Sequence, residues 1–198
     1  MAIFNSEFRD KLKGKRIAIL ATEGFEEVEL VKPKKALEHA GATVDVIAPK
    51  SGIKSNQIKA WDMTDWGGKI KADVELSTAN SNNYDASHLP GGVMNPDHLR
   101  MDPQAVAFVK SFLSKANRYP LSAMPLGCSS KPTLFAIKTV TSWPSLQADL
   151  RNAGAHWVDK EVVMDKNLVT SRKADDLRAF NKAMIDLFSH AIKHHVAA

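Results

Sequence analysis

The chain has 198 residues with ordinary apolar content and no internal repeat, so it fits one domain with a full core. Its formal net charge of +5 does not indicate a nucleic-acid partner, because the lysines are scattered among acidic residues. The densest basic groups, Lys32-Pro33-Lys34-Lys35 and Lys193-His194-His195, are more typical of solvated helix faces and a frayed helix end than of a binding patch or a metal site.

Compartment signals are few. Residues 1–16 lack the apolar run of a signal peptide, and no stretch approaches the ~20 apolar residues that a membrane span requires. The only cysteine, Cys128, excludes an internal disulfide framework and is typical of a reducing compartment. We therefore expect a soluble cytoplasmic protein that has no membrane partner.

The first part of the chain predicts a βαβ unit. Residues 16–21 form a continuous apolar run, as in a central parallel strand that is covered on both faces. After a turn, a helix is expected from Glu27 to Ala40, and Gly41 ends it. Residues 43–47 then predict a second strand, so the sheet begins parallel.

The middle of the chain continues the alternation of strands and helices. Polar segments with short strands are expected around residues 53–74. Residues 84–89 predict an inner strand that Pro90-Gly91-Gly92 closes, and Pro103 opens a helix that continues towards Ser114. This order is that of a doubly wound α/β sheet.

The C-terminal part keeps the same pattern. We expect a strand at residues 139–143, a helix at 146–153, strands near 162–164 and 168–170, and a closing amphipathic helix at 175–195. Ligands of such sheets bind beyond the carboxyl ends of the strands.

Residues 115–137 interrupt this regular pattern, because Pro120, Pro125 and Pro132 would break any strand or helix there. Shifting the possible codons of residues 122–127 by one base gives Cys-His-Ala-Pro-Trp, with a buried-strand pattern before it and an amphipathic-helix pattern after it. We hypothesise that the segment is an out-of-frame reading, opened by one missing base and closed by one extra base. The alternative is a natural loop of unusual composition.

Four segments carry specific motifs: residues 21–30 (ATEGFEEVEL), 89–97 (LPGGVMNPD), 141–146 (TSWPSL) and 150–159 (LRNAGAHWVD). Together they resemble the PfpI-type intracellular proteases, in the superfamily of the Parkinsonism-associated protein deglycase and the class I glutamine amidotransferases. The resemblance covers about residues 15–188. It implies one PfpI-like domain over residues 1–198 with an N-terminal extension at 1–14. The implied fold is a flavodoxin-like three-layer α/β sandwich with a mainly parallel central sheet.

The resemblance also implies where the nucleophile belongs. In this family a cysteine on a strand-to-helix turn is followed by a histidine. Counting the family spacing from Gly92 and from Trp143 places Ala123 in the cysteine slot and Met124 in the histidine slot. Both counts agree with the shifted codons.

Further site residues follow from the same resemblance. Glu29 would be the carboxylate that contacts the thiol, with Glu26 on the same helical face. Asp97 matches the acidic residue that a neighbouring subunit presents to the histidine, which implies a homo-oligomer, a dimer or larger. Gly91 and Gly92 match the turn whose N–H groups face a developing oxyanion. We expect no metal and no cofactor.

The implied activity is that of a cysteine hydrolase in stress protection, because a thiolate at such a turn attacks a carbonyl carbon. The substrate would be a peptide, or a glycated protein or aldehyde. As written, the chain lacks the nucleophile, so the alternative is a non-catalytic family member that acts as a binding or holdase-like stress protein. A third interpretation makes Cys128 the nucleophile, but no histidine follows it and Pro132 would interrupt the helix behind it.

The same residues also have purely structural interpretations. Glu26 and Glu29 would serve as first-turn acids favoured by the helix dipole, and Asp97 would sit in a surface turn. Gly91-Gly92 alone would be a turn. His88 stands where the family has an apolar strand residue, so it would be buried, either as a satisfied core histidine or as another error in the reading.

Overall fold

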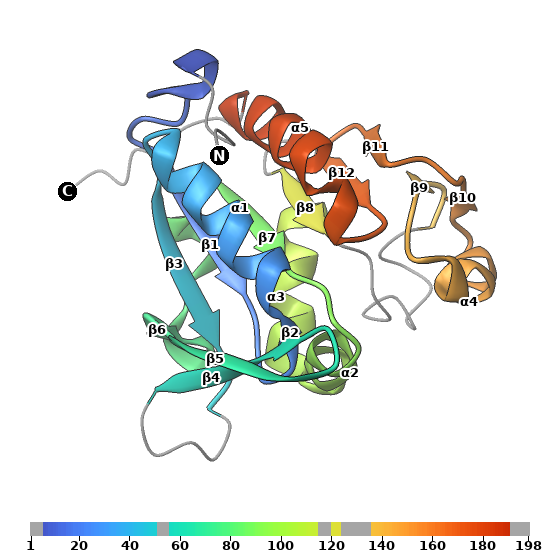
Figure 1. The fold of residues 1–198 in the computed structure, drawn as a ribbon, viewed down its shortest axis with the longest axis horizontal. Coiled ribbons are helices and arrows are strands. Elements are labelled where there is room, and N and C mark those ends of the chain that lie inside the picture. The colour runs from blue at the N-terminus through green and yellow to red at the C-terminus, as the bar shows by residue number, and fades with distance from the viewer. Residues whose placement is uncertain (1–5, 51–55, 115–119, 124–135, 191–198) are drawn as a thin grey trace.

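The computed structural model describes residues 6–50, 56–114, 120–123 and 136–190. Its main sheet has seven strands in the order β11-β12-β8-β7-β1-β3-β6 (Figure 1). Their bounds are β1 (Arg16–Leu20), β3 (Thr43–Ala48), β6 (Val74–Glu75), β7 (Ala86–Leu89), β8 (Leu121–Ala123), β11 (Val162–Asp165) and β12 (Leu168–Ser171). Neighbouring strands are parallel except β11, which runs antiparallel to β12. The inner order β3-β1-β7-β8-β12 is flavodoxin-like, with its switch point between β1 and β7.

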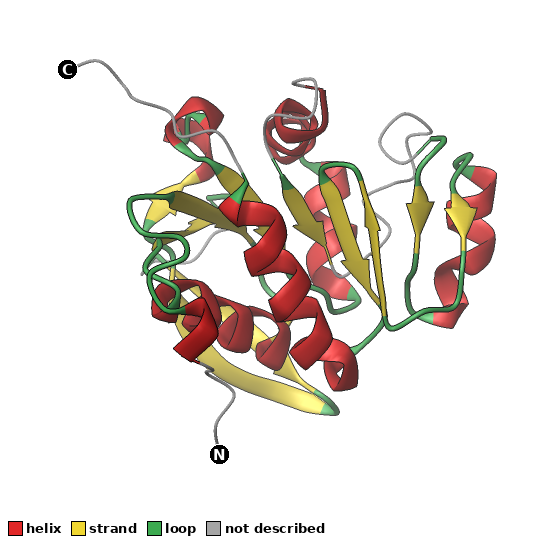
Figure 2. Ribbon diagram, turned by 90° about the horizontal axis from the view of Figure 1, so that it is seen from above, coloured by secondary structure: helices red, strands yellow, loops and turns green. Residues whose placement is uncertain are grey.

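Helices cover both faces of this sheet, which confirms the expected three-layer α/β sandwich (Figure 2). On one face lie α1 (Glu27–His39) and α5 (Leu177–Ser189), whose Leu37 and Phe180 pack in one cluster with Ile17 and Ile19 of β1. The other face carries α3 (Pro103–Ser114), whose Phe108 and Phe112 pack with Leu20. Because both faces are covered, β1 is apolar and buried from Ile17 to Leu20, as the run at residues 16–21 predicted.

Smaller elements surround this core. A second sheet has the order β2-β4-β5, from β2 (Phe25–Glu26), β4 (Gln57–Asp62) and β5 (Asp65–Lys71), and β9 (Thr139–Val140) pairs with β10 (His156–Trp157). Short helices are α2 (Met94–Met101) and α4 (Gln147–Asn152). Single 3₁₀ turns lie at Ser6–Phe8, Leu76–Thr78, Ser81–Asn83, Pro144–Leu146 and Ala174–Asp176. Since β2 ends where α1 begins, the β4–β5 hairpin is held beside the first turn of α1.

Most predicted elements are confirmed, and the differences have local causes. Gly41 ends α1 with φ of +90°, as expected of a C-terminal glycine. The strand expected at 139–143 stops at Val140, because the N–H of Thr141 donates to the side-chain hydroxyl of Thr170 on β12 (3.1 Å) instead of to a backbone carbonyl. The closing helix begins at Leu177, and the part expected beyond residue 190 lies outside the described residues.

The expectation that proline would break any strand in residues 115–137 was wrong for β8. This strand occupies the centre of the sheet, between β7 and β12. Pro120 stands just before it, where a missing N–H costs no ladder bond, and its carbonyl accepts from the N–H of Ser87 (3.1 Å). The first donor is Leu121, which bonds the carbonyl of Asn167 (2.8 Å). Pro125 and Pro132 lie outside the described residues.

The segment before β1 contributes one residue, Leu12, to the core described here. Leu12 is fully buried with the apolar side chains under α1, and its N–H donates to the carbonyl of Ala40 (2.7 Å). In the described ranges, every helix is too short or too polar to cross a membrane.

Candidate active site

A cavity of about 680 Å³ opens where the loops after β1, β7, β9 and β12 meet. β1, β7 and β12 run parallel in the main sheet, so their carboxyl ends lie at one edge of the fold, which is where doubly wound sheets bind ligands. Four residues that the sequence singled out line this one cavity: Glu26, Glu29, Gly92 and Asp97. The structure therefore brings together positions that are up to some seventy residues apart along the chain.

Glu29 lies in the first turn of α1 with its side chain buried. Burial raises the pKa of its carboxyl to about 8, and the nearby charge of Glu26 adds to the effect. A hydrogen bond with the backbone of Gly91 works in the opposite direction. At neutral pH Glu29 is therefore mainly a carboxylic acid, which both donates and accepts hydrogen bonds.

The neighbouring glutamates tie the start of α1 to the β4–β5 hairpin. The Oε1 of Glu26 accepts the N–H of Met63 at 3.4 Å, and the Oε2 of Glu27 accepts the N–H of Gly68 at 2.6 Å. Burial raises the pKa of Glu26, while the bond from Met63 partly offsets the rise. These contacts hold the hairpin turn at the mouth of the cavity, where Met63 forms part of the lining.

The turn after β7 fits closely against the loop after β1. Gly92 has φ of +97°, and a Cβ on it would lie 2.6 Å from the carbonyl oxygen of Gly24. The carbonyl of Gly91 accepts the N–H of Glu26 at 3.1 Å. A backbone of this shape requires glycine at position 92, which gives the second glycine of the Gly91-Gly92 motif a structural reason.

Asn95 joins these two loops and was not identified from the sequence. Its side chain is fully buried, with Oδ1 accepting the N–H of Thr22 (2.7 Å) and Nδ2 donating to the carbonyl of Pro90 (2.9 Å). From the sequence, the Asn95-Pro96 pair indicated only a surface turn. In the structure the pair lies inside α2, where Asn95 fixes the two loops relative to each other.

Ala123, the expected cysteine slot, is the last residue of β8 and is buried. It pairs in parallel register with Leu89, the residue directly before the Pro90-Gly91-Gly92 turn, and with Thr170 of β12. The slot therefore lies at the same edge of the sheet as that turn. Met124, the histidine slot, and Cys128 lie outside the described residues.

Asp97 reaches the cavity from α2. Its side chain is 46% exposed and forms an ion pair with Arg100 one turn later. This position is compatible with both interpretations from the sequence, a surface acid and an acid offered to a second subunit. Its neighbour His98 is exposed.

His88 is a satisfied core histidine, one of the two possibilities that the sequence left open. Its ring is fully buried in β7, with Nδ1 3.0 Å from the Ser122 hydroxyl and Nε2 2.9 Å from the carbonyl oxygen of Glu29. Burial lowers its pKa to about 4, so the ring is neutral at physiological pH. A carbonyl only accepts, so Nε2 carries the proton and Nδ1 accepts from Ser122.

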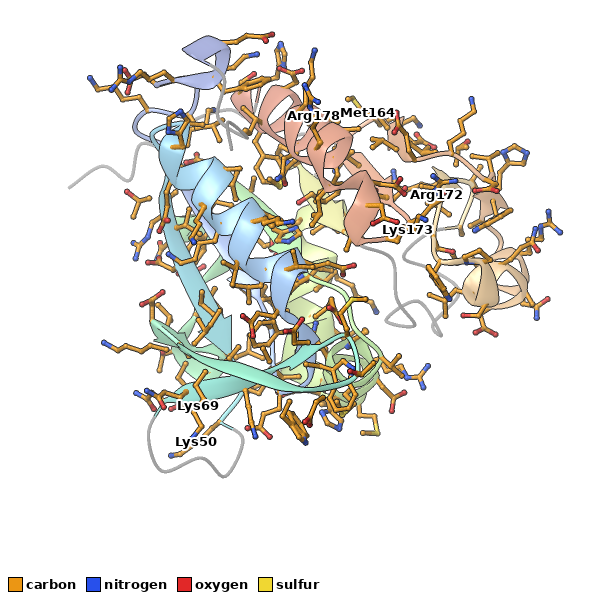
Figure 3. The ribbon with its side chains drawn as sticks, in the orientation of Figure 1. Lys50, Lys69, Met164, Arg172, Lys173 and Arg178 are labelled. Atoms are coloured by element: carbon orange, nitrogen blue, oxygen red, sulfur yellow. The ribbon has the colours of Figure 1, made fainter. Side chains whose placement is uncertain are left out.

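Basic side chains form another wall of the cavity, and they were not singled out from the sequence. Arg172 and Lys173 lie where β12 leads into α5 (Figure 3). Arg172 bonds Asp176 through two nitrogens (2.9 and 3.1 Å) and also Asp159 (2.7 Å), while Lys173 pairs with Asp175 (2.9 Å). The three carboxylates neutralise both cations, so this wall carries no net positive charge.

The other basic side chains labelled in Figure 3 lie apart from this wall: Lys50 follows β3, Lys69 is on β5 and Arg178 is on α5. Among the described residues there is no group of three or more His, Cys, Asp or Glu side chains that could hold a metal ion.

Comparison with known proteins agrees with this geometry. Residues 15–187 match the DJ-1/PfpI family. A Bacillus subtilis protein named "Putative cysteine protease YraA" is 37% identical over 175 residues, covering 87% of this chain and 98% of that protein. General stress protein 18 of the same organism is 36% identical over 182 residues, covering 88% of this chain and 98% of that protein.

A solved structure of this family has the same fold. The crystal structure of Drosophila melanogaster DJ-1beta superposes with a TM-score of 0.77 at 25% sequence identity, covering 89% of this chain and 91% of that chain. The family match extends over most of the sequence and includes every motif that lines the cavity. This chain belongs to the DJ-1/PfpI family.

Proposed function

We propose that this protein is a cysteine hydrolase that acts in stress protection, with its nucleophile at position 123. The proposal includes the out-of-frame reading of residues 115–137, which supplies cysteine and histidine at the slots of Ala123 and Met124. It is supported by one observation above all: Ala123 ends a buried central strand at the edge where Glu29 and the glycine turn lie. The names of the two Bacillus relatives agree with it.

The chemistry of this site follows from the residue types. The thiolate would attack a carbonyl carbon, and the N–H groups of the Gly91-Gly92 turn would stabilise the oxyanion. With a peptide, the C–N bond breaks, the amine leaves with a proton from the histidine, and water then hydrolyses the thioester. With an aldehyde or its adduct, the first product is a thiohemiacetal. The protonated carboxyl of Glu29 would donate a hydrogen bond to the sulfur and favour the thiolate.

The site also supports assembly into a homo-oligomer, dimer or larger. Asp97 lines the cavity while about half of its side chain remains exposed. A second subunit could therefore approach this acid, as the family resemblance implies. We also propose that the protein is cytoplasmic, as expected from the sequence. Its substrate would be a peptide, a glycated protein or an aldehyde.

A second function, that of a non-catalytic binding or holdase-like protein, is favoured by the pair His88 and Ser122. Both side chains are polar, and inside the sheet the Nδ1 of His88 and the hydroxyl of Ser122 form a hydrogen bond of 3.0 Å. The shifted frame permits isoleucine at position 122, and such an apolar residue would leave the Nδ1 of His88 without this partner. If residues 121–123 are as written, the slot holds a methyl group and no thiol.

The deciding experiment is the intact mass of the protein with peptide mapping across residues 111–143. A fragment that contains Cys-His-Ala-Pro-Trp would support the hydrolase, and rapid thiol labelling near pH 7 should then mark that cysteine. A fragment that matches residues 115–137 as written would reject the shifted frame. The protein would then be the non-catalytic family member, and labelling would reach only Cys128.

A further inference from the structure

A proline lies inside α1, where it removes one hydrogen bond of the helix. Pro33 stands in the middle of the helix and is buried. In a regular α-helix the N–H of residue 33 would donate to the carbonyl of residue 29, but proline has no N–H. The helix therefore cannot supply the usual donor for the carbonyl of Glu29, whose side chain lines the candidate active site. A buried acceptor of this kind needs a donor from elsewhere.

His88 of β7 supplies this donor. Its Nε2 lies 2.9 Å from the carbonyl oxygen of Glu29, and because a carbonyl only accepts, Nε2 carries the proton. The ring is fully buried and lies against Phe180 of α5, with the two ring centroids 5.7 Å apart. Two residues that are unusual in their elements, a proline inside a helix and a histidine inside a buried strand, thus explain each other.

The segment from His88 to Gly91 holds Glu29 at two points. The ring of His88 bonds its carbonyl group, and the backbone of Gly91 forms a hydrogen bond with its carboxyl group. His88 is also the residue of β7 that pairs with position 122 of β8, directly before Ala123. One side chain therefore connects the helix turn that carries the carboxyl to the strands that end at the proposed nucleophile position.

We propose that His88 is a positioning residue for the Glu29 carboxyl: its Nε2–H replaces the N–H that Pro33 lacks and fixes the first turn of α1 against β7. An apolar residue at position 88 would leave the carbonyl of Glu29 without this bond, and the turn would be held less firmly. The inference rests on the proposed function for its catalytic meaning, since Glu29 is there the carboxyl that contacts the thiol. The contact itself does not depend on the reading of residues 115–137, because all three residues lie outside that segment.

The test removes the donor and then restores it from the helix. His88→Leu eliminates the Nε2–H, and Pro33→Ala returns to α1 an N–H that can bond the carbonyl of Glu29. The readout is the pKa of the Glu29 carboxyl, followed by carbon NMR of protein with isotope-labelled glutamate carboxyls and assigned with Glu29→Gln. Glu26, whose charge also acts on this carboxyl, is unchanged in every variant.

His88→Leu should lower the Glu29 pKa from about 8 by roughly one or more, because a first turn that is held less firmly buries the carboxyl less well. The double variant His88→Leu with Pro33→Ala should regain most of the raised value. A histidine that only filled space in the sheet would not be replaced by an N–H at position 33, so this rescue separates positioning from packing.

Pro103→Ala is the matched control. Pro103 is the first residue of α3, where a missing N–H removes no helix bond. Combined with His88→Leu, it should leave the pKa of Glu29 lowered. In urea unfolding, Pro33→Ala should raise the midpoint more in the His88→Leu protein than in the unsubstituted protein. Equal gains in the two proteins, or a Glu29 pKa that no substitution changes, would overturn the inference.

If His88→Leu does not fold, the double variants decide. Recovery of folding by Pro33→Ala and not by Pro103→Ala supports the inference, and any other result overturns it.

The proposed hydrolase is tested separately. If the peptide map shows cysteine at position 123, labelling of that thiol by iodoacetamide near pH 7 should slow by about tenfold in His88→Leu and recover with Pro33→Ala. Unchanged labelling would overturn the inference. A peptide map that matches the chain as written would reject the hydrolase, whereas the fall and rescue of the Glu29 pKa would still support the inference.

Discussion

Gly92 approaches Gly24 so closely that a Cβ on Gly92 would lie 2.6 Å from the carbonyl oxygen of Gly24. The same Cβ would also lie 2.8 Å from the backbone nitrogen of Glu26, and the φ of +97° is itself unfavourable for any other residue. Backbone atoms cannot move aside as a flexible side chain can. The loops after β1 and β7 therefore meet through glycine only.

We predict that Gly92→Ala destabilises the protein by at least about 3 kcal/mol, because backbone clash adds to the strained φ. Gly154→Ala is the control: Gly154 also has positive φ (+85°), but its Cβ would only reach ordinary contact with Ala136 at 3.7 Å. That variant should lose about 1–2 kcal/mol, the cost of the backbone conformation alone. Urea unfolding measures both, and equal losses would contradict the close approach.

Asn95 and Asn181 are both buried asparagines, but only Asn95 has partners. Asn95 bonds Thr22 and Pro90, whereas neither polar side-chain atom of Asn181 has a hydrogen-bond partner among the described residues. Asn95→Leu should cost about 2–4 kcal/mol, because it leaves a buried N–H and a buried carbonyl unpaired. Asn181→Leu should be neutral or stabilising, since it removes an unsatisfied polar group.

Chemical denaturation of the two asparagine variants at pH 7 checks this contrast. The substitutions are of the same type and size, so a general intolerance of leucine would affect both. Similar losses of stability would show that the link between Thr22 and Pro90 does not hold the two loops. Asn95→Leu should in addition weaken ligand binding in the cavity, whereas Asn181→Leu should not.

The burial of Glu29 predicts an unusual dependence of stability on pH. Its folded pKa of about 8 lies above the ordinary value of 4.5, so the folded state binds more protons between these values. Stability is therefore lost as the pH rises through this range. Glu29→Gln keeps the shape without the charge, so its stability relative to the unsubstituted protein should increase by about 1–3 kcal/mol from pH 5 to pH 9.

The matched control for Glu29 is Glu38→Gln, on the exposed side of the same helix, where Glu38 pairs with Lys34. It should shift the urea midpoint little at any pH, as expected of a surface ion pair. Parallel stability curves for Glu29→Gln and the unsubstituted protein would show that Glu29 is ionised in the folded state at neutral pH.

Much of the fold could be predicted because its signals are local. The apolar run at residues 16–21, the helix ended by Gly41 and the proline that opens α3 each act over a few residues. α2 was missed because Asn95-Pro96 is typical of turns, although proline is tolerated in the first turn of a helix. The three-residue strand β8 was missed because Pro120, directly before it, was expected to break any strand there.

The candidate site likewise contains residues that could be predicted from the sequence and residues that could not. Glu26, Glu29, Gly92 and Asp97 could be named from motifs, and the structure brings them to one cavity. Met63 and Trp143 could not be assigned to that cavity, because their loops meet only through the tertiary packing of parallel strands that are distant in sequence. Ser122 could not be identified as the partner of His88 for the same reason, because the register between β7 and β8 depends on the packing of the whole sheet.

The buried pair of His88 and Ser122 gives the last prediction. Its folded histidine pKa of about 4 lies below the ordinary value of 6.5, so the unfolded chain binds more protons between these values. Stability should therefore fall as the pH drops from about 6.5 to about 4. His88→Leu removes this titration, so stability should depend less on pH on the acid side. Either single change, His88→Leu or Ser122→Val, should also lower stability, because it leaves the buried polar partner without its hydrogen bond.

The double variant His88→Leu with Ser122→Val replaces both partners by apolar side chains, as in an ordinary strand pair. We expect it to be more stable than the sum of the single losses predicts, with a coupling of about 0.5–3 kcal/mol in a double-mutant cycle. Ser87→Val is the control, because the Ser87 hydroxyl is buried one residue away with no hydrogen-bond partner in the described structure. Combined with His88→Leu it should show no coupling. Strict additivity for His88 and Ser122 would mean that the pair contributes nothing to the sheet, and the case for serine at position 122 would then depend on the peptide map alone.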